Sequence, residues 1–288
     1  MPGVRVVTDS ASDLTADLTA AHGITVVPLT IRFGDDELLD GRDLTAASFW
    51  DRCKRSPALP ETAAPPPGAF QTAFEAAADG GADGVLCCTI SSRLSATYQA
   101  ALAGAEAAAG RVPVRVIDTR SVTMGQGLLC LAAAEAAAGG ASLDAVARQV
   151  EDLIGRTQVL GVVDTLDHLQ RGGRIGGAAA LLGSLLSIKP VIELRDGLVQ
   201  QESKQRTRGR SLDYLVAKVA AAAPLERLAV SNGGAVDVDA VVARLAAVDV
   251  AHELVVVDLG PVVGTHAGPG TIGVSYQVPA GSPGGGSH

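Results

Sequence analysis

Aromatic side chains are scarce in this 288-residue sequence, where Phe, Trp and Tyr together make up 3% of the residues. This scarcity argues against a site that stacks a nucleotide or a flavin, and it leaves a core built from Ala, Val, Leu and Ile. Basic residues are also few: 23 Lys and Arg stand against 31 Asp and Glu, which gives a net charge of −8. Because phosphate binding needs a broad basic surface, no nucleic-acid partner is expected. With 47% hydrophobic and 19% charged residues, the chain is expected to be globular.

The four cysteines show no Cys-x-x-Cys spacing, and Cys87 and Cys88 lie in an apolar run typical of a buried strand. We therefore expect reduced, structural thiols, as in a cytoplasmic protein. No apolar run reaches the ~18 residues that span a bilayer. The first residues lead directly into a predicted strand without a signal-peptide pattern, which favours the same location.

Common catalytic and cofactor motifs are missing. The sequence contains no Gly-x-x-x-x-Gly-Lys-Ser/Thr, no His-Glu-x-x-His and no Gly-x-Ser-x-Gly, and the glycine-rich stretch 172–177 does not fit the dinucleotide-binding pattern. The five histidines and four cysteines show no metal-ligand spacing. We therefore expect no catalytic residue, no metal and no cofactor.

The first half of the sequence alternates apolar, β-branched runs with helical patterns. This alternation predicts a parallel sheet covered by helices on both faces, in an α/β domain of residues 1–160. Strands are expected at 4–8, 24–31, 85–90 and 114–118, and helices at 14–21, 43–55, 124–138 and near 142–156, with two more ending near 78 and 109. The helix at 124–138 has almost no polar face, so it is expected either to be buried or to line a cavity.

The pattern changes after residue 160, and a smaller α+β domain is predicted for residues 161–278. Two strands, at 188–194 and 198–203, flank Arg195-Asp196-Gly197, which is a strong hairpin signal. Further strands are expected at 159–163, 228–231, 253–258 and 273–278, with helices at 208–223 and 236–247, and with a short helix, a glycine-rich turn and a second apolar helix between 166 and 186. Residues 279–288 are rich in glycine, serine and proline and are expected to form a flexible tail.

The stretch at 260–270 reads Gly-Pro-Val-Val-Gly-Thr-His-Ala-Gly-Pro-Gly and follows an apolar run. Its glycines and prolines predict a rigid loop at a strand end, which presents Thr265 and His266. Such loops build small polar binding sites in α/β proteins. A tight turn whose histidine merely packs explains the same residues equally well, so both interpretations stay open.

Hydroxyl side chains gather at two other places. Ser91, Ser92 and Ser95 follow a buried strand at the start of a helix, where free backbone N–H groups and the helix dipole favour an anion. Thr62 lies in an extended, proline-rich loop. A single serine would be explained as a helix N-cap, but three within five residues exceed what capping needs. Thr62, Ser92 and His266 together would suit one small anion, such as a carboxylate.

Basic side chains are unevenly distributed for an acidic protein. Arg206 and Arg208 lie where basic and polar residues alternate, and Arg171 and Arg174 flank two glycines. These residues form either an ordinary solvated face or a docking patch for an acidic or phosphate-carrying partner.

Six groups of short motifs are spread over nearly the whole chain. They are Val7-Thr8-Asp9-Ser10 with Asp13-Leu14; Ile90-Ser91-Ser92-Arg93-Leu94-Ser95-Ala96-Thr97-Tyr98; Val116-Ile117-Asp118-Thr119 with Met124-Gly125-Gln126-Gly127; Asp164-Thr165-Leu166; Gly172-Gly173-Arg174-Ile175 with Ile188-Lys189-Pro190; and Gly260-Pro261-Val262 with Gly264-Thr265-His266 and Gly268-Pro269-Gly270. In this order and spacing they resemble the DegV family of bacterial fatty-acid-binding proteins. The chain departs from the family pattern at Ala63-Ala64, where Ser-Gln is usual, and at Arg93 and Ala96, which replace two glycines.

The resemblance implies a two-domain α/β protein that holds one long-chain fatty acid in an internal apolar tunnel. It implies that Thr62, Ser92 and His266 contact the carboxylate, with Ser95 and Thr265 as lesser candidates. The bound fatty acid would be a ligand rather than a cofactor.

The same resemblance implies a role outside catalysis. The protein would present the carboxylate to a separate ATP-binding kinase subunit, related to dihydroxyacetone kinases, and the acyl phosphate would feed phospholipid synthesis. Arg174, Arg206 and Arg208 would form the docking surface for that subunit, and contact with a membrane would be transient.

Two other functions remain open. Ser92 with His266 would serve a stand-alone serine hydrolase, although neither a third residue nor an elbow motif supports it. The glycine-rich stretch 172–177 would bind a phosphorylated metabolite in a regulatory protein. Bound lipid, ester hydrolysis without a partner, and phosphometabolite binding distinguish the three.

Overall fold

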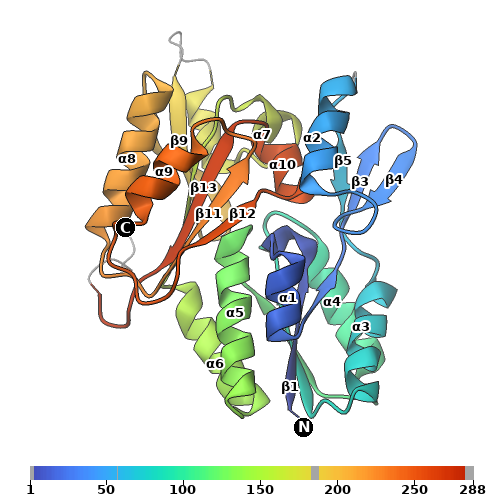
Figure 1. Ribbon diagram of the computed structural model, residues 1–288. Coiled ribbons are helices and arrows are strands. Elements are labelled where there is room, and N and C mark those ends of the chain that lie inside the picture. The colour runs from blue at the N-terminus through green and yellow to red at the C-terminus, as the bar shows by residue number, and fades with distance from the viewer. Residues whose placement is uncertain (1–2, 57, 183–187, 283–288) are drawn as a thin grey trace.

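The strand–helix alternation of the first half builds a four-stranded parallel sheet, as the sequence predicts. In the computed structural model, which describes residues 3–56, 58–182 and 188–282, the strand order is β2-β1-β6-β7. The strands are β1 (Val4–Asp9), β2 (Ile24–Val27), β6 (Gly84–Thr89) and β7 (Val114–Asp118). Alternate strand side chains pack on opposite faces, so helices cover both sides (Figure 1). The helices are α1 (Ala16–His22), α5 (Met124–Ala138) and α6 (Leu143–Ile154) on one face, and α3 (Pro67–Asp79) and α4 (Thr97–Ala108) on the other.

A second, small sheet interrupts this pattern and was not expected from the sequence. The predicted strand at 24–31 is in fact two strands, because Pro28 follows β2 and has no N–H to continue the ladder. The chain then forms the antiparallel order β4-β3-β5, from β3 (Thr30–Phe33), β4 (Asp36–Leu39) and β5 (Glu61–Ala63). Helix α2 (Ala46–Arg55) packs on this sheet through the buried Phe49.

The second half of the chain forms a six-stranded sheet in the order β10-β9-β8-β13-β11-β12. All neighbours in it are antiparallel except β11 and β12, which are parallel. Its strands are β8 (Thr157–Val162), β9 (Lys189–Arg195), β10 (Leu198–Gln205), β11 (Arg227–Gly233), β12 (Val255–Asp258) and β13 (Thr271–Gln277). Strand β8 crosses residue 160, so this sheet begins before the predicted boundary. The expected hairpin is present, with Arg195 paired to Leu198 around a two-residue turn.

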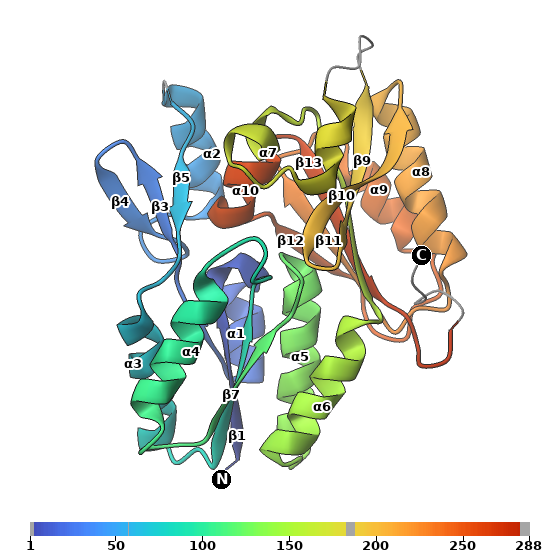
Figure 2. The same ribbon diagram turned by 180° about the vertical axis from the view of Figure 1, so that it is seen from behind.

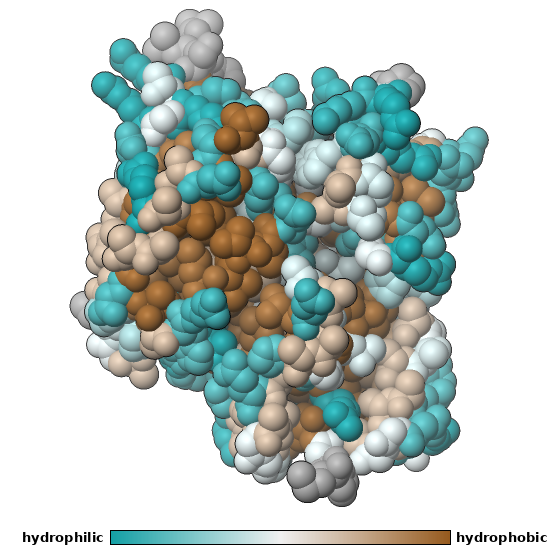
Figure 3. Space-filling model, in the orientation of Figure 1, coloured by the Kyte–Doolittle hydropathy of each residue, from teal (hydrophilic) through white to brown (hydrophobic). Residues whose placement is uncertain are grey.

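Helices α8 (Arg208–Ala221) and α9 (Val238–Leu245) cover the outer face of the six-stranded sheet. Apolar residues also gather on the outside near α9 and β12, where Val236 and Val256 are 102% and 49% exposed (Figure 3). Neither residue lines the interior cavity described below.

Helix α5 lies between the two large sheets and contacts strands of both (Figure 1). Its residues 124–134 are all buried, which explains why the sequence gives this helix no polar face. The glycine at 125 allows the close approach, since a Cβ there would overlap the side chain of Val159 on β8. The predicted bounds of this helix are confirmed.

The segment between β8 and β9 carries α7 (Asp167–Arg171) and the 3₁₀ helix η2 (Gly176–Leu181). The expected second apolar helix runs into residues 183–187, which lie outside the described residues, as does most of the predicted tail. Among the described residues, no helix has the length and apolar character needed to cross a bilayer.

Candidate functional site

An interior cavity lies between the inner face of the six-stranded sheet and the turns of the first half of the chain. About 220 Å³ of it is open to the centre of a water molecule, far more than the ~10–15 Å³ that one water needs. Its walls are mainly aliphatic and come from distant segments, including Ile90 and Leu94 after β6, Val159 on β8, Ile192 on β9 and Val262 on helix α10 (Pro261–Ala267). Aliphatic side chains therefore line a space of substantial size, although the core as a whole also contains the four phenylalanines, Phe33, Phe49, Phe70 and Phe74.

One end of this cavity is polar. The sequence predicted that His266 lies in a loop, but the residue lies on the short helix α10. Pro261 stands at its start, where a missing N–H costs nothing, and Gly268 ends it with a positive φ. The Nε2 atom of His266 lies 2.9 Å from Oγ1 of Thr62 on β5, a residue 204 positions away. Figure 2 shows β5, α10 and α7 side by side at this point.

The His266 imidazole is neutral at physiological pH. Burial lowers its pKa to about 4, and the positive charge of the nearby Arg174 adds to the effect. Its Nδ1 atom is buried, has no hydrogen-bond partner among the described residues, and lies against Gly172, where any Cβ would overlap it. A buried N–H without an acceptor is costly, so the arrangement favours the proton on Nε2. Nε2–H then donates to Thr62, and the Thr62 hydroxyl hydrogen is left to donate into the cavity.

Ser95 and Arg174 line the same cavity. The Ser95 hydroxyl lies 2.8 Å from that of Thr97. The Arg174 guanidinium donates from Nε to the carbonyl of Leu94 at 3.1 Å and from Nη1 to that of Gly172 at 2.6 Å. Within the described part of the chain, no carboxylate forms an ion pair with Arg174. Its charge is therefore available to an anion near the Thr62–His266 pair.

The polar end adjoins an outer cleft, in which about 590 Å³ is open to the centre of a water molecule. Thr62, Arg174 and His266 line both spaces. The cleft is otherwise lined by Cys53 of α2, by residues 56 and 58–61, and by α7, including His168 and Arg171. A polar group placed at Thr62 would thus have the apolar interior on one side and the cleft on the other.

Two of the predicted carboxylate contacts point elsewhere. Ser92 is exposed, and its hydroxyl donates to Asp118 Oδ2 at 2.5 Å, while its N–H donates to Oδ1 of the same residue. Thr265 is buried, with its hydroxyl donating to the carbonyl of Pro261 at 2.8 Å, and it lines the outer cleft but not the interior cavity. The structure therefore brings Thr62, Ser95 and His266 to one space, and Ser92 and Thr265 away from it. Arg93 is exposed beside Ser92.

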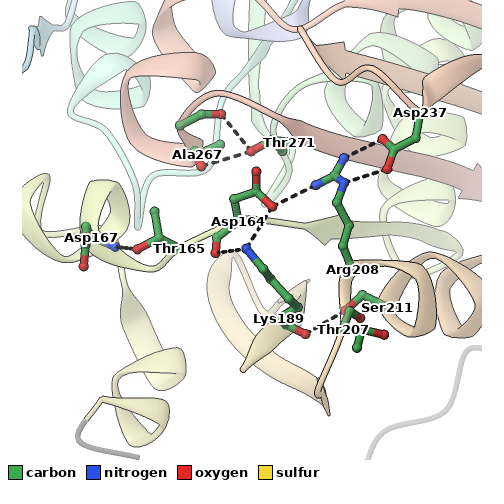
Figure 4. Close-up of polar contacts among 11 residues, drawn as sticks. Asp164, Thr165, Asp167, Lys189, Thr207, Arg208, Ser211, Asp237, Ala267 and Thr271 are labelled. Carbon is green, nitrogen blue, oxygen red and sulfur yellow. Dashed lines mark hydrogen bonds and ion pairs between the residues drawn. The ribbon is translucent and has the colours of Figure 1, made fainter. Parts of the chain in front are cut away.

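The predicted docking arginines differ in their surroundings. Arg206 is exposed. The Arg208 guanidinium donates to both carboxylate oxygens of Asp237 at 2.7 Å and to Asp164 at 3.1 Å (Figure 4). Lys189 also donates to Asp164, at 3.2 Å, and so joins the two ends of the segment between β8 and β9. The partly buried Arg208 is thus paired with two carboxylates of its own chain.

Three buried carboxylates near the cavity were given no role by the sequence, although two of them, Asp9 and Asp13, belong to the first of the quoted motifs. Asp13 accepts from Thr123 Oγ1 at 2.5 Å and from the N–H of Gly260 at 3.1 Å, and so ties the two halves together. Asp9 accepts from the N–H of Ile90 at 2.8 Å. Burial raises the pKa of Asp9 to about 6 and that of Asp40 to about 7, and it holds the pKa of Asp13 well above its usual range.

The fold and the cavity define an α/β protein with a mainly aliphatic interior cavity that is polar at one end. A family model for the DegV family of uncharacterised proteins matches residues 3–278. The chain belongs to this family.

Relatives cover nearly all of the chain. A DegV domain-containing protein of Streptomyces coelicolor is 38% identical over 286 residues, which is 94% of this chain and 97% of the relative. A DegV family protein from Thermus thermophilus, whose structure is described as fatty acid binding, has a TM-score of 0.88 at 34% identity and covers 96% of this chain and 100% of its own. A stearic acid-binding protein from Eubacterium ventriosum has a TM-score of 0.87 at 25% identity, with 95% and 98% covered.

Proposed function

We propose that the protein binds one long-chain fatty acid in the interior cavity, with its carboxylate at the Thr62–His266 pair, and presents that carboxylate to a separate kinase subunit. The observation that carries this proposal is a mainly aliphatic cavity in which Thr62, Arg174 and His266 form a polar end that adjoins an outer cleft. The fatty acids described for the two structural relatives support the same ligand class.

The apolar walls supply the binding energy. The fourteen methylenes of a palmitoyl chain contribute ~0.8 kcal/mol each when they leave water, or about 11 kcal/mol in all before the costs of ordering the chain. The carboxylate would lose several kcal/mol if it were buried without donors. The Thr62 and Ser95 hydroxyls offset that loss, and the charge of Arg174, which pairs with no carboxylate of the described residues, stabilises the anion.

The neutral His266 acts as a positioning residue in this scheme. Its Nε2–H fixes the Thr62 oxygen, so the hydroxyl hydrogen points to the ligand. Hydroxyl donors hold a carboxylate less tightly than a bidentate arginine does, which suits a group that must then attack a phosphoryl donor. The kinase would reach the carboxylate through the outer cleft, with Arg174 and the exposed Arg206 as docking contacts.

The other two functions lack support at the site. A hydrolase would need Ser92 close to His266. The Ser92 hydroxyl is instead hydrogen-bonded to Asp118, and Nε2 of His266 is hydrogen-bonded to Thr62. In the glycine-rich stretch, a Cβ at Gly176 or Gly177 would overlap residues of β10. These glycines are thus explained by packing.

Two measurements test the proposal. Denaturing extraction of the purified protein, followed by mass spectrometry, should find about one acid of roughly 14 to 18 carbons per chain, and a delipidated sample should take one up. With ATP and the dihydroxyacetone-kinase-like subunit of the source organism, hydroxylamine trapping should detect acyl phosphate. His266→Ala and Ser95→Ala should reduce its formation, while Ser92→Ala should not. A protein with no acid and no uptake would contradict the proposal.

A further inference from the structure

Two glycines face each other at the centre of the six-stranded sheet. Gly161 on β8 is the register partner of Gly273 on β13, and both line the interior cavity. The row continues to Ile192 on β9 and Ser231 on β11, the partners of these glycines on their outer sides. Paired residues of antiparallel strands share a face, and Ile192 lines the cavity, so this row faces the interior.

The neighbouring residues confirm which way the row faces. Val162 and Val274, which follow the two glycines, are fully buried in the cluster beneath α8 on the opposite face. Val159 and Thr271, two positions before them, line the cavity. Side chains alternate along a strand, so any side chain at 161 or 273 would project toward the cavity.

The fold itself does not require glycine at either position. Neither residue has a positive φ. A Cβ at Gly161 would meet Ile192 Cγ1 at 3.3 Å, which a small shift of that side chain relieves, and a Cβ at Gly273 would meet Ser231 Cβ at 3.4 Å, an ordinary contact. At Gly233, by contrast, a Cβ would lie 2.9 Å from the backbone oxygen of Thr271, so packing demands glycine there. Glycine weakens a strand interior and commonly marks the close approach of a ligand.

We propose that the Gly161–Gly273 pair forms a groove across which the acyl chain passes, and that this groove sets the length of acid that the protein accepts. Because neither glycine has a side chain, an opening is left between Ser231 and Ile192. These two residues lie three strands apart, and neighbouring strands are separated by ~4.8 Å. A chain anchored at the Thr62–His266 pair crosses this opening to reach the aliphatic walls beyond. This inference rests on the proposed function.

The test compares chain lengths. Delipidated wild type, Gly161→Ala and Gly273→Ala are titrated with saturated acids from about 8 to 18 carbons, with Gly209→Ala as the control, because a Cβ at Gly209 meets nothing within 4 Å. Acids too short to reach the row should bind all four proteins alike. Longer acids should bind the two groove variants more weakly, by roughly fourfold for each methylene displaced, while the control matches wild type. Circular dichroism and thermal unfolding check that each variant folds.

Ile192→Ala adds room to the same row and keeps the test open if an alanine variant misfolds. It should move the preferred chain length upward. Equal palmitate affinity in wild type and both groove variants, or one uniform loss at every chain length, would overturn the inference. A wild type that binds no acid at all would instead overturn the proposed function.

Discussion

Replacing Thr62 with valine removes one hydroxyl and little else. Valine keeps the volume and the β-branched shape that suit β5, and the neutral His266 then has no partner for its Nε2–H. A hydrogen bond to a charged group contributes ~1.5–3 kcal/mol, or about 10- to 150-fold in Kd. Because the outer cleft adjoins this end of the cavity, water partly replaces the lost donor. We therefore expect palmitate to bind roughly 10- to 30-fold more weakly.

The assay is displacement of a fluorescent fatty acid from delipidated protein, with methyl palmitate as the comparison ligand. The ester carries no charge, so its loss should be about fivefold or less. Thr30→Val is the matched control, since Thr30 lies on the neighbouring strand and lines neither the cavity nor the cleft. Equal losses for acid and ester, or no loss for the acid, would refute the assignment of Thr62 as the head-group donor.

Three further expectations concern the scaffold. Arg208→Ala should lower the free energy of unfolding in urea by ~1–3 kcal/mol, because Asp237 and Asp164 then lose their guanidinium partner in a partly exposed network. Binding of the fatty acid should persist in this variant. The raised pKa values of Asp9 and Asp40, about 6 and about 7, mean that the native state binds more protons than the unfolded chain, so stability should fall as pH rises from about 4 to about 7, and Asp40→Asn should flatten that slope. Gly264→Ala should force α10 away from α2, since its Cβ would lie 2.9 Å from Phe49 and 3.0 Å from Trp50. Fluorescence of Trp50, the only tryptophan, should shift and acid binding weaken, and an unchanged spectrum and Kd would contradict this packing argument.

Features set by hydrophobic pattern could be predicted from the sequence. The buried helix 124–138 and the hairpin around Asp196-Gly197 needed only local information, namely the lack of a polar face and a turn signal. The small sheet of β3, β4 and β5 was missed because its strands are short and partly polar. Helix α10 was mistaken for a loop because its glycines and prolines oppose helix formation, whereas Pro261 starts it and Gly264 fits against α2.

The partners of polar side chains could not be predicted. Ser92 and Ser95 lie in one turn, and only the fold places Asp118 beside the first and the cavity beside the second. Arg208 resembled part of a basic surface, but its carboxylate partners are 29 and 44 residues away in sequence. Thr62, Ser95 and His266 line the cavity and were among the predicted contacts, but the sequence could not separate them from Ser92 and Thr265. Nothing in the sequence indicated Thr123 and Thr271, which line the same cavity.

A crystal structure of the delipidated protein soaked with palmitate tests the central claim most directly. We predict continuous density for one chain in the interior cavity, with a carboxylate oxygen within hydrogen-bonding distance of Thr62 Oγ1 and the chain lying across Gly161 and Gly273. Density confined to the outer cleft, or a chain reversed so that its carboxylate lies at Val159, would contradict the account.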